Sequence, residues 1–398
     1  MKGSMSAGSA SRIATVARKE LVDTVRDRRT ILVTLISAAL AGPIFLLLMF
    51  NMFASQADRA RELKLAVQGA EHAPALIAYL ERQQVKISPA PDDFEKQIRG
   101  GDLDVVMIVE PTFEKDVGKG RAATVRLVYD RSRDRARASI EQAETLLRAY
   151  NRQWGQMRLL LRGIAPEVGN PLNVETVNLA TPQQSGAIVL FLLAYYGLFA
   201  AVMGGMAVAL DTTAGERERT SLEPLLMTPA RPFELVGGKW LATTLFNAFV
   251  VLVTLGAFWA TLALAPLPPV GIPFLFGATE FRRFIVVLLP IIALVPAVLL
   301  WIGTRGRTYK EAQANVSVLM LVVAIVPFFQ LFLRQREPDW IALVPISGQY
   351  ALLNRVLRGE GIPLPELAMS WMVPVGLIVF ALYAVARLWS RESMLVGK

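Results

Sequence analysis

Long uncharged stretches alternate with charged segments along this chain. No charged residue occurs from Thr176 to Leu210, and none occurs from Trp240 to Thr279. An α-helix needs about 20 mostly apolar residues to cross a bilayer. The pattern therefore predicts six membrane-spanning helices, at about Thr30–Phe53, Ser185–Leu210, Lys239–Ala265, Phe284–Gly303, Ala312–Leu333 and Leu367–Ala386.

A different pattern precedes the first span. After 11 small and polar residues, apolar residues recur at helical spacing between Ser11 and Arg29, with charged residues among them. The apolar positions are Ile13, Val16, Ala17, Leu21 and Val25. We expect residues 1–29 to form a cytoplasmic segment with an amphipathic helix that lies on the membrane surface.

Residues 54–183 are more polar and contain short apolar runs. These runs predict strands at 63–69, 85–88, 102–109, 124–130 and 174–180. Helices are predicted between them at 75–84, 92–99 and 111–117, and a longer one at 133–162. The long helix has a stripe made by Ile140, Ala143, Leu147, Tyr150, Trp154 and Met157. Alternating strands and helices indicate a small α/β domain between the first and second spans.

Basic residues assign the two sides of the membrane. The first 29 residues, the loop 211–239, the turn 304–311 and the tail from Arg387 hold 17 Lys and Arg residues, against six in the short loops of the other face. Cytoplasmic loops carry the excess of Lys and Arg. The sequence thus predicts an α-helical integral membrane protein with six transmembrane helices, cytoplasmic N and C termini, and an extracytoplasmic α/β domain.

Composition then excludes several kinds of chemistry. The chain has 398 residues, of which 54% are hydrophobic and only 19% charged, and its mean hydropathy is +0.42. It has no cysteine and one histidine, His72, so disulfides, thiolate metal sites and a histidine metal centre are excluded. The net charge of +9 is explained by the cytoplasmic basic residues, and we expect no nucleic-acid partner. Neither Gly-Lys pair, at 118–119 and 238–239, has the surroundings of an ATP-binding P-loop.

The loop 211–238 is the most distinctive charged segment. Its sequence GERERTSLEPLLMTPARP, at 215–232, predicts a short amphipathic helix ended by Pro229 and Pro232. Glu216, Arg217 and Arg219 are expected to face a partner. The alternative is that a charged loop between two spans serves only to determine topology.

The stretch AGERERTSLEPLLMTPARPFELVGGKWLA resembles the signature region of ABC-2-type transporter permease subunits. RTYKEAQ at 307–313 and the segment VPISGQYALLNRVLRGE at 344–360 resemble the sodium-efflux (NatB-like) branch, although ISGQY departs from its pattern. This resemblance implies a coupling loop at 211–238, an outer re-entrant segment at 335–366, and the bacterial cytoplasmic (inner) membrane. It also implies two copies of the chain and two copies of a separate cytoplasmic ATPase subunit, which binds the ATP and Mg²⁺.

By the same resemblance, the coupling loop and the N-terminal helix contact the ATPase subunit. The residues expected to couple to it are Glu216, Arg217, Glu218, Arg219, Thr220, Leu222, Glu223, Arg18 and Lys19. We expect no catalytic residue, metal site or bound cofactor in this chain.

Polar residues inside the spans are candidates for the substrate pathway because each costs free energy unless it is satisfied. These candidates are Asn51, Asn247, Gln313, Asn315, Ser317 and Gln330. Hydrogen bonds between helices are the alternative explanation. Charged residues are expected only at the ends of the spans, and Gly204 and Gly205 are expected at a contact between protomers.

Three functions are compatible with these patterns. The first is ATP-driven export with sodium as the substrate, and the second is export of a drug, lipid or peptide. The third is an ATP-driven complex that passes force to the extracytoplasmic domain and its binding partner. A membrane-embedded enzyme has no residues to support it.

Overall fold

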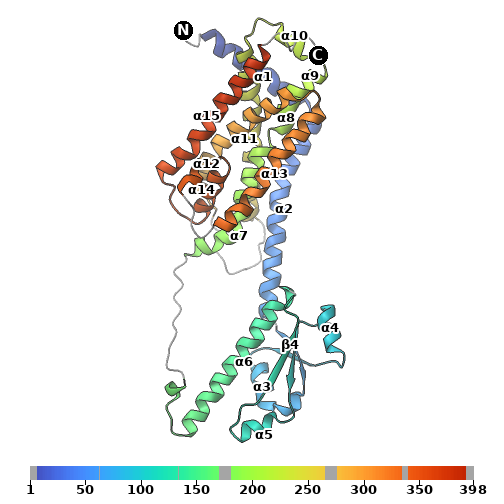
Figure 1. The fold of residues 1–398 in the computed structure, drawn as a ribbon, viewed down its shortest axis with the longest axis vertical. Helices are drawn as coiled ribbons and strands as arrows, with labels where there is room; N and C mark the ends of the chain where they lie inside the picture. Colours follow the sequence, from blue (N-terminus) through green and yellow to red (C-terminus); the bar gives the residue numbers. More distant parts are fainter. Residues whose placement is uncertain are drawn as a thin grey trace. The chain divides into compact units, whose positions relative to one another are not determined.

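The computed structural model describes residues 7–61, 63–132, 134–169, 181–264, 276–333 and 339–390. The chain divides into two compact units. The helical unit comprises Met1–Met49, Ala180–Leu267 and Gly271–Lys398, and the α/β unit comprises Phe50–Leu179 and Pro268–Val270. Figure 1 shows the helices and the sheet that make up these units.

Six described helices are long and apolar enough to cross a bilayer, which confirms the six expected spans. The protein is therefore a multi-pass membrane protein. The apolar parts are Arg28–Met52, Leu190–Glu218, Pro232–Leu264, Ala278–Arg305, Tyr309–Val326 and Leu364–Trp389. Five spans belong to the single helices α2 (Arg28–Arg61), α11 (Pro232–Leu264), α12 (Ala278–Arg305), α13 (Tyr309–Leu333) and α15 (Leu364–Trp389).

The second span is composed of four consecutive helical pieces. These are α7 (Pro182–Met203), α8 (Met206–Leu210), the π-helical segment η3 (Asp211–Gly215) and α9 (Glu216–Glu218). Between α7 and α8, a Cβ on Gly204 would lie only 2.5 Å from the Asn247 Oδ1 atom of α11. The close approach that this glycine permits is therefore to α11 of the same chain, rather than the expected contact between protomers.

The third span begins earlier than expected. Its helix α11 starts at Pro232, seven residues before Lys239, because proline suits the first turn of a helix. The Glu234 carboxylate also accepts a hydrogen bond from the Arg231 N–H, at 2.9 Å, at this helix start. Charged residues were expected only at the span ends; Glu216 and Glu234 lie near the ends of their apolar helices, and Lys239 lies seven residues after the start of α11.

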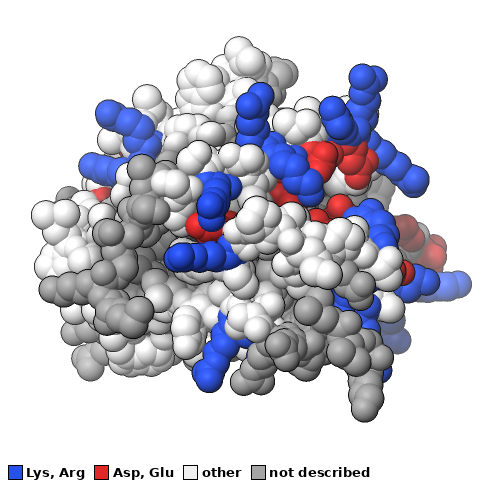
Figure 2. All heavy atoms as spheres, turned by 90° about the horizontal axis from the view of Figure 1, so that it is seen from above, with Lys and Arg blue, Asp and Glu red and all other residues white. Residues whose placement is uncertain are grey.

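One end of the helical unit brings together both ends of the described chain. The N-terminal helix α1 (Ala7–Arg26) begins four residues before the expected Ser11. It lies at the same end as α9, α10 (Leu222–Leu226) and the last turn of α15 (Figure 1). Seen from this end, Lys and Arg side chains surround a smaller group of Asp and Glu side chains (Figure 2). We call this end of the helical unit the basic end.

The segment before the last span folds into two short helices away from the basic end (Figure 1). These are η4 (Asp339–Leu343) and α14 (Ser347–Leu357), within the segment predicted to be re-entrant. The Gln349 side chain is buried, and its Nε2 donates to the Ser370 carbonyl oxygen of α15 at 2.7 Å. Residues 334–338 lie outside the described part of the chain.

The α/β unit contains a four-stranded mixed sheet in the order β2–β1–β3–β4, which confirms a small α/β domain between the first two spans. Its strands are β1 (Lys64–Gln68), β2 (Lys86–Pro89), β3 (Val105–Val109) and β4 (Val125–Tyr129). β1 pairs in parallel with β2 and β3, whereas β3 pairs antiparallel with β4, with Met107 opposite Leu127. The strand expected at 174–180 lies outside the described residues.

Helices cover both faces of this sheet. Successive side chains of a strand point to opposite faces, and both sets are apolar here, so each face packs against helices. Leu65 and Met107 pack with α3 (Pro74–Arg82) and α6 (Asp134–Leu161) on one face. Val106 packs with α4 (Phe94–Gly100) on the other, and the helix α5 (Phe113–Gly118) follows β3. The expected stripe of α6 packs on the sheet only as far as Tyr150, since Trp154 and Met157 are exposed.

Candidate functional site

The Lys239 side chain is completely buried at the basic end. Its Nζ donates to Glu20 Oε1 at 2.8 Å and to Glu216 Oε1 at 2.7 Å. Glu20 belongs to α1, Glu216 to α9, and Lys239 to α11. One ammonium group therefore joins three helices that are far apart in the sequence.

A second lysine completes this group of charges, which we call the Lys239 cluster (Lys19, Glu20, Glu216 and Lys239). Lys19 Nζ lies 3.2 Å from Glu20 Oε1 and 3.8 Å from Glu216 Oε1, with its side chain half exposed. Burial opposes the charge of Lys19, but the neighbouring carboxylates prevail and raise its pKa above the ordinary value. The cluster thus holds two positive and two negative charges, so the buried ones are compensated.

Glycine permits α1 and α11 to approach closely beside this cluster. A Cβ on Gly238 would lie 2.5 Å from the Val16 Cβ atom and 3.0 Å from the Ile13 carbonyl oxygen. At Gly237, the added atom would meet the Ile13 side chain at an ordinary 3.6 Å. An ion pair between Arg12 and Glu234, at 3.4 Å, lies further along the same two helices. The N-terminal helix is therefore packed firmly on the third span.

The π-helical segment η3 leads into the charged turn. Its Thr213 hydroxyl donates to the Ala209 carbonyl oxygen at 2.6 Å, and a side chain at Gly303 of α12 would collide with this threonine. Arg219 then donates back to Asp211 Oδ1 at 2.6 Å. These contacts fix the turn against α12.

The charged turn has an inner and an outer side. Glu216 is 9% exposed and faces Lys239, whereas Glu218, Arg219 and Thr220 are exposed. Glu218 accepts a hydrogen bond from the Tyr309 N–H at 2.8 Å, which links the turn to the start of α13. Arg217 is half-buried, and its guanidinium donates to the Thr304 carbonyl oxygen at 3.4 Å.

The helix after the turn packs inside the chain through its apolar side. Leu222 is 7% exposed and lies in a cluster with Leu235 and Val236 of α11 and Val385 and Trp389 of α15. The side chain of Glu223 lies outside the described part of the structure. In the segment that follows, the Met227 side chain is 82% exposed.

Seven of the nine residues expected to face an ATPase subunit fall into two groups, apart from the half-buried Arg217 and from Glu223. Glu216 and Leu222 are turned inward, in contrast to the outward position expected for Glu216. Glu218, Arg219, Thr220, Arg18 and Lys19 have exposed side chains. The exposed members of the turn, together with Met227, form what we call the outer turn surface (Glu218, Arg219, Thr220 and Met227).

Sequence reasoning missed Glu20 and Lys239. Glu20 lies seven residues after Ile13 and four after Val16, on the apolar stripe of α1. A carboxylate on an apolar stripe indicates a buried partner. That signal was present in the sequence, but Lys239 was assigned to the beginning of a span.

Among the residues that the structure describes, no side-chain hydrogen bond joins two of the candidate amides of the spans. Asn247 is completely buried, and its Nδ2 donates to the carbonyl oxygens of Ala201 at 2.7 Å and Ile292 at 3.1 Å. Asn247 therefore forms hydrogen bonds between helices, which was the alternative to a role in the substrate pathway. Asn51, Gln313 and Asn315 are exposed in the single chain, and the side chain of Gln330 is outside the described residues.

Two comparisons with known proteins agree with this arrangement. The profile of a family described as "ABC-2 family transporter protein" matches residues 32–387. The chain is also 28% identical over 383 residues to a protein of Bacillus subtilis (strain 168) named "ABC transporter permease protein NatB". That alignment covers 93% of this chain and 96% of the relative.

Proposed function

The chain belongs to the ABC-2 family of transporter proteins and is a permease subunit of such a transporter, and we propose that it exports sodium ions. Family membership implies a partnership with an ABC ATPase subunit. In our proposal two copies of the chain pair with two copies of that subunit, which binds ATP and Mg²⁺. The basic end then faces the cytoplasm of a bacterial cell and the α/β unit lies outside.

One observation carries the coupling part of the proposal: Lys239 fixes α1 and α9 to α11, while the outer turn surface beside it is exposed. A rigid body transmits movement between an ATPase and the spans better than a flexible loop does. In this proposal the ATPase subunit contacts the outer turn surface. Glu216 and Leu222 act as positioning residues, because they hold the turn in place from the inside.

Sodium is supported by similarity rather than by a cluster of ligands. The motifs at 307–313 and 344–360 resemble the sodium-efflux branch, and NatB of Bacillus subtilis is similar over most of the chain. The amide side chains of Gln313 and Asn315 in α13 are exposed in a single chain. A second copy of the chain could therefore bury them at the contact between the two copies. We propose that they line the pathway.

Co-purification with the ATPase subunit tests the coupling surface. Met227→Glu is expected to abolish co-purification, because it places a charge on an exposed apolar side chain of the outer turn surface. The matched control is Met157→Glu, the same change at an exposed position of the α/β unit. Equal recovery of the ATPase subunit with both variants would place the docking surface elsewhere.

Sodium efflux tests the substrate. Asn315→Ala and Gln313→Ala are each expected to abolish ATP-dependent sodium efflux from cells that depend on this transporter. Val318→Ala, at an exposed apolar position of the same helix, is the control that should retain efflux. Unchanged efflux in both alanine variants would rule out these amides as ligands of the ion.

A second function is favoured by the α/β unit, which has its own cores on both faces of the sheet. An ATP-driven complex could use such a domain to transmit force to a partner. Deletion of about residues 60–175 distinguishes the two functions. An exporter of ions, drugs, lipids or peptides retains ATP-driven flux without the domain, whereas a force-transmitting complex loses its activity.

A further inference from the structure

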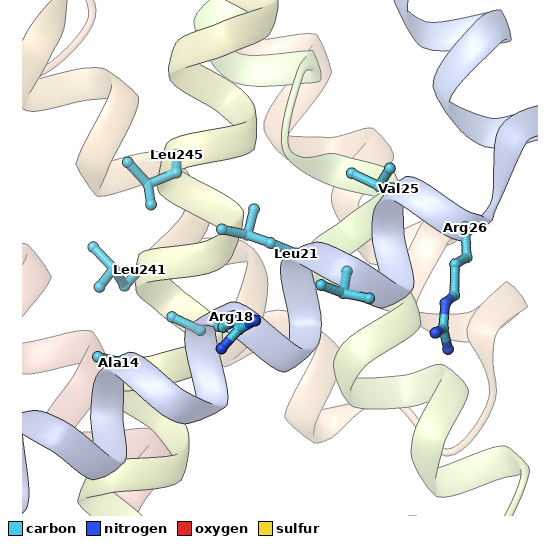
Figure 3. A pocket seen from close by; sticks show the side chains of 9 residues that line it. Ala14, Arg18, Leu21, Val25, Arg26, Leu241 and Leu245 are labelled. Carbon is cyan, nitrogen blue, oxygen red and sulfur yellow. The ribbon is translucent and has the colours of Figure 1, made fainter.

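A shallow apolar groove lies between the N-terminal helix and the third span. It has a volume of about 450 Å³, and its walls come from α1 and α11 (Figure 3). Leu21, Val22 and Val25 of α1 form one side, and Leu241 and Leu245 of α11 form the other. Val25 is 63% exposed and Leu245 is 49% exposed. On an amphipathic helix at a membrane, apolar side chains of this kind contact the acyl chains of the lipids.

Two arginines border this groove. Arg18 and Arg26 both contribute to its lining, and both side chains are exposed. No ion pair or side-chain hydrogen bond joins either of them to another residue that the structure describes. Their neighbours in α1 behave differently, since Arg12 pairs with Glu234 and Lys19 pairs with Glu20. The groove therefore combines apolar walls with two unpaired positive charges.

The charges and the apolar walls are arranged along the direction of the third span. Leu245 is 13 residues beyond Pro232, which places it about 20 Å into α11 at the rise of an α-helix. Figure 3 shows Leu21 and Val25 directed toward the side of Leu245, and the Arg26 side chain directed the opposite way. The apolar part of the groove thus lies deeper along the span than this guanidinium group.

We propose that the groove is a binding site for one anionic phospholipid. An acyl chain covers the walls formed by Val22, Val25 and Leu245, and the phosphate pairs with Arg18 and Arg26. The charge of the occupant follows from the two unpaired arginines, and its apolar chain follows from the exposed leucine and valine side chains. A neutral lipid would cover the apolar walls without pairing with the arginines, and inorganic phosphate would pair with the arginines without covering the walls. The proposal depends on the membrane position of α11 and is independent of the exported substrate.

Native mass spectrometry of the purified full chain in detergent tests this site. The probes are phosphatidylglycerol and phosphatidylcholine with identical acyl chains. We expect one tightly bound phosphatidylglycerol per chain. The Arg18→Gln/Arg26→Gln variant is expected to bind it roughly 30-fold more weakly, since each basic residue near a membrane contributes about 1 kcal/mol. Phosphatidylcholine should bind weakly, and equally, to the unaltered chain and to the Arg18→Gln/Arg26→Gln variant.

The matched control is Arg307→Gln/Lys310→Gln, which removes two exposed positive charges from the same basic end but outside the groove. It should bind phosphatidylglycerol as the unaltered protein does. Equal loss in the control would show that net charge, rather than the groove, attracts the lipid. Equal binding of the two lipids by the unaltered protein would also overturn the proposal.

Two further measurements separate the remaining occupants. Release of phosphatidylglycerol by excess inorganic phosphate would show that the arginines bind a free phosphate, and the lipid proposal would then fail. The proposal would fail as well if Arg18→Gln/Arg26→Gln lost the ATPase subunit but kept the lipid. If the double variant does not fold, Val22→Trp provides a second test, because the larger side chain fills the groove. This variant should lose the binding of both phosphatidylglycerol and phosphatidylcholine.

Discussion

At the scale of single residues, Lys239 is stable as a buried cation because two carboxylates, of Glu20 and Glu216, contact its ammonium group. Taking a charge out of water costs several kcal/mol, and only excellent geometry offsets that cost. The cluster therefore contributes specificity more than net stability. It defines one position for α1 and α9 on α11, since any displacement would leave a buried charge unpaired.

Lys239→Met is expected to destabilise the protein, because it leaves the carboxylates of Glu20 and Glu216 with the half-exposed Lys19 as their remaining cation. The expected loss is at most about 3–5 kcal/mol, the range for breaking a buried pair by removing one partner. Thermal unfolding of the purified protein in detergent measures it. Adding Glu20→Gln and Glu216→Gln to this variant should recover part of the loss, because the repulsion is then removed.

The control for this prediction is Lys310→Met. Lys310 is an exposed lysine near the start of α13, at the same end of the helical unit. Its substitution is expected to change the free energy of unfolding by less than about 0.5 kcal/mol. If Lys239→Met were equally mild, the ammonium group would not hold the three helices together.

The residue scale is also where the sequence predicted least. The exposed positions of Glu218 and Arg219 agree with an amphipathic turn, but the inward position of Glu216 depends on Lys239 and Glu20, which are distant in the sequence. Local periodicity contains no information about such contacts. Only the misplaced carboxylate of Glu20 on the stripe of α1 indicated that a buried cation was needed.

At the scale of elements, the packing of α1 on α11 depends on neighbouring glycines that differ in the space around them. A methyl group at Gly238 would overlap with Val16, whereas one at Gly237 would make an ordinary contact with Ile13. Alanine favours a helix by about 1 kcal/mol over glycine. The two positions therefore make a matched pair for testing the contact.

Gly238→Ala is expected to displace α1 from α11, and Gly237→Ala is expected to leave it in place. Trypsin cleavage after Arg18 and Lys19 measures the displacement, because a detached helix is cleaved faster. Co-purification of the ATPase subunit should fall in Gly238→Ala alone. Equal cleavage of the two variants would mean that α1 is held by its ion pairs and not by close packing.

Elements were more predictable than their contacts. Uncharged runs predicted all six spans, and the four described strands lie within a residue or a few residues of their expected bounds. The start of α11 was missed by seven residues, since Glu234 resembles a loop residue until its partner Arg12 is known. The exposed end of α6 was missed because its stripe continues beyond the sheet on which it packs.

At the scale of the whole molecule, the even number of spans places α1 and the end of α15 at one end of the helical unit, where basic side chains gather (Figures 1 and 2). Sequence alone predicted this arrangement through the excess of Lys and Arg in alternate loops. The side of the membrane that each end faces is a prediction that labelling can test.

Single cysteines make that test direct, because the chain contains none. Lys119→Cys in the α/β unit and Gly361→Cys before α15 should react with a membrane-impermeant maleimide on intact cells. Thr308→Cys, at the basic end, should react only after the membrane is opened. Labelling of Thr308→Cys on intact cells would reverse the topology and, with it, the position proposed for the ATPase subunit.

The π-helical segment Asp211–Gly215 has a consequence for how the chain tolerates changes in length. A π-helical turn accommodates one residue more than an α-helical turn. Because the wide turn absorbs the extra residue, deleting one residue there is expected to restore regular α-helix and to leave Glu216 directed at Lys239. The same deletion within the regular helix α7 would instead rotate everything after it by about 100° around the helix axis. The joint is therefore expected to tolerate the loss of one residue in Asp211–Gly215 better than in the helix that precedes it.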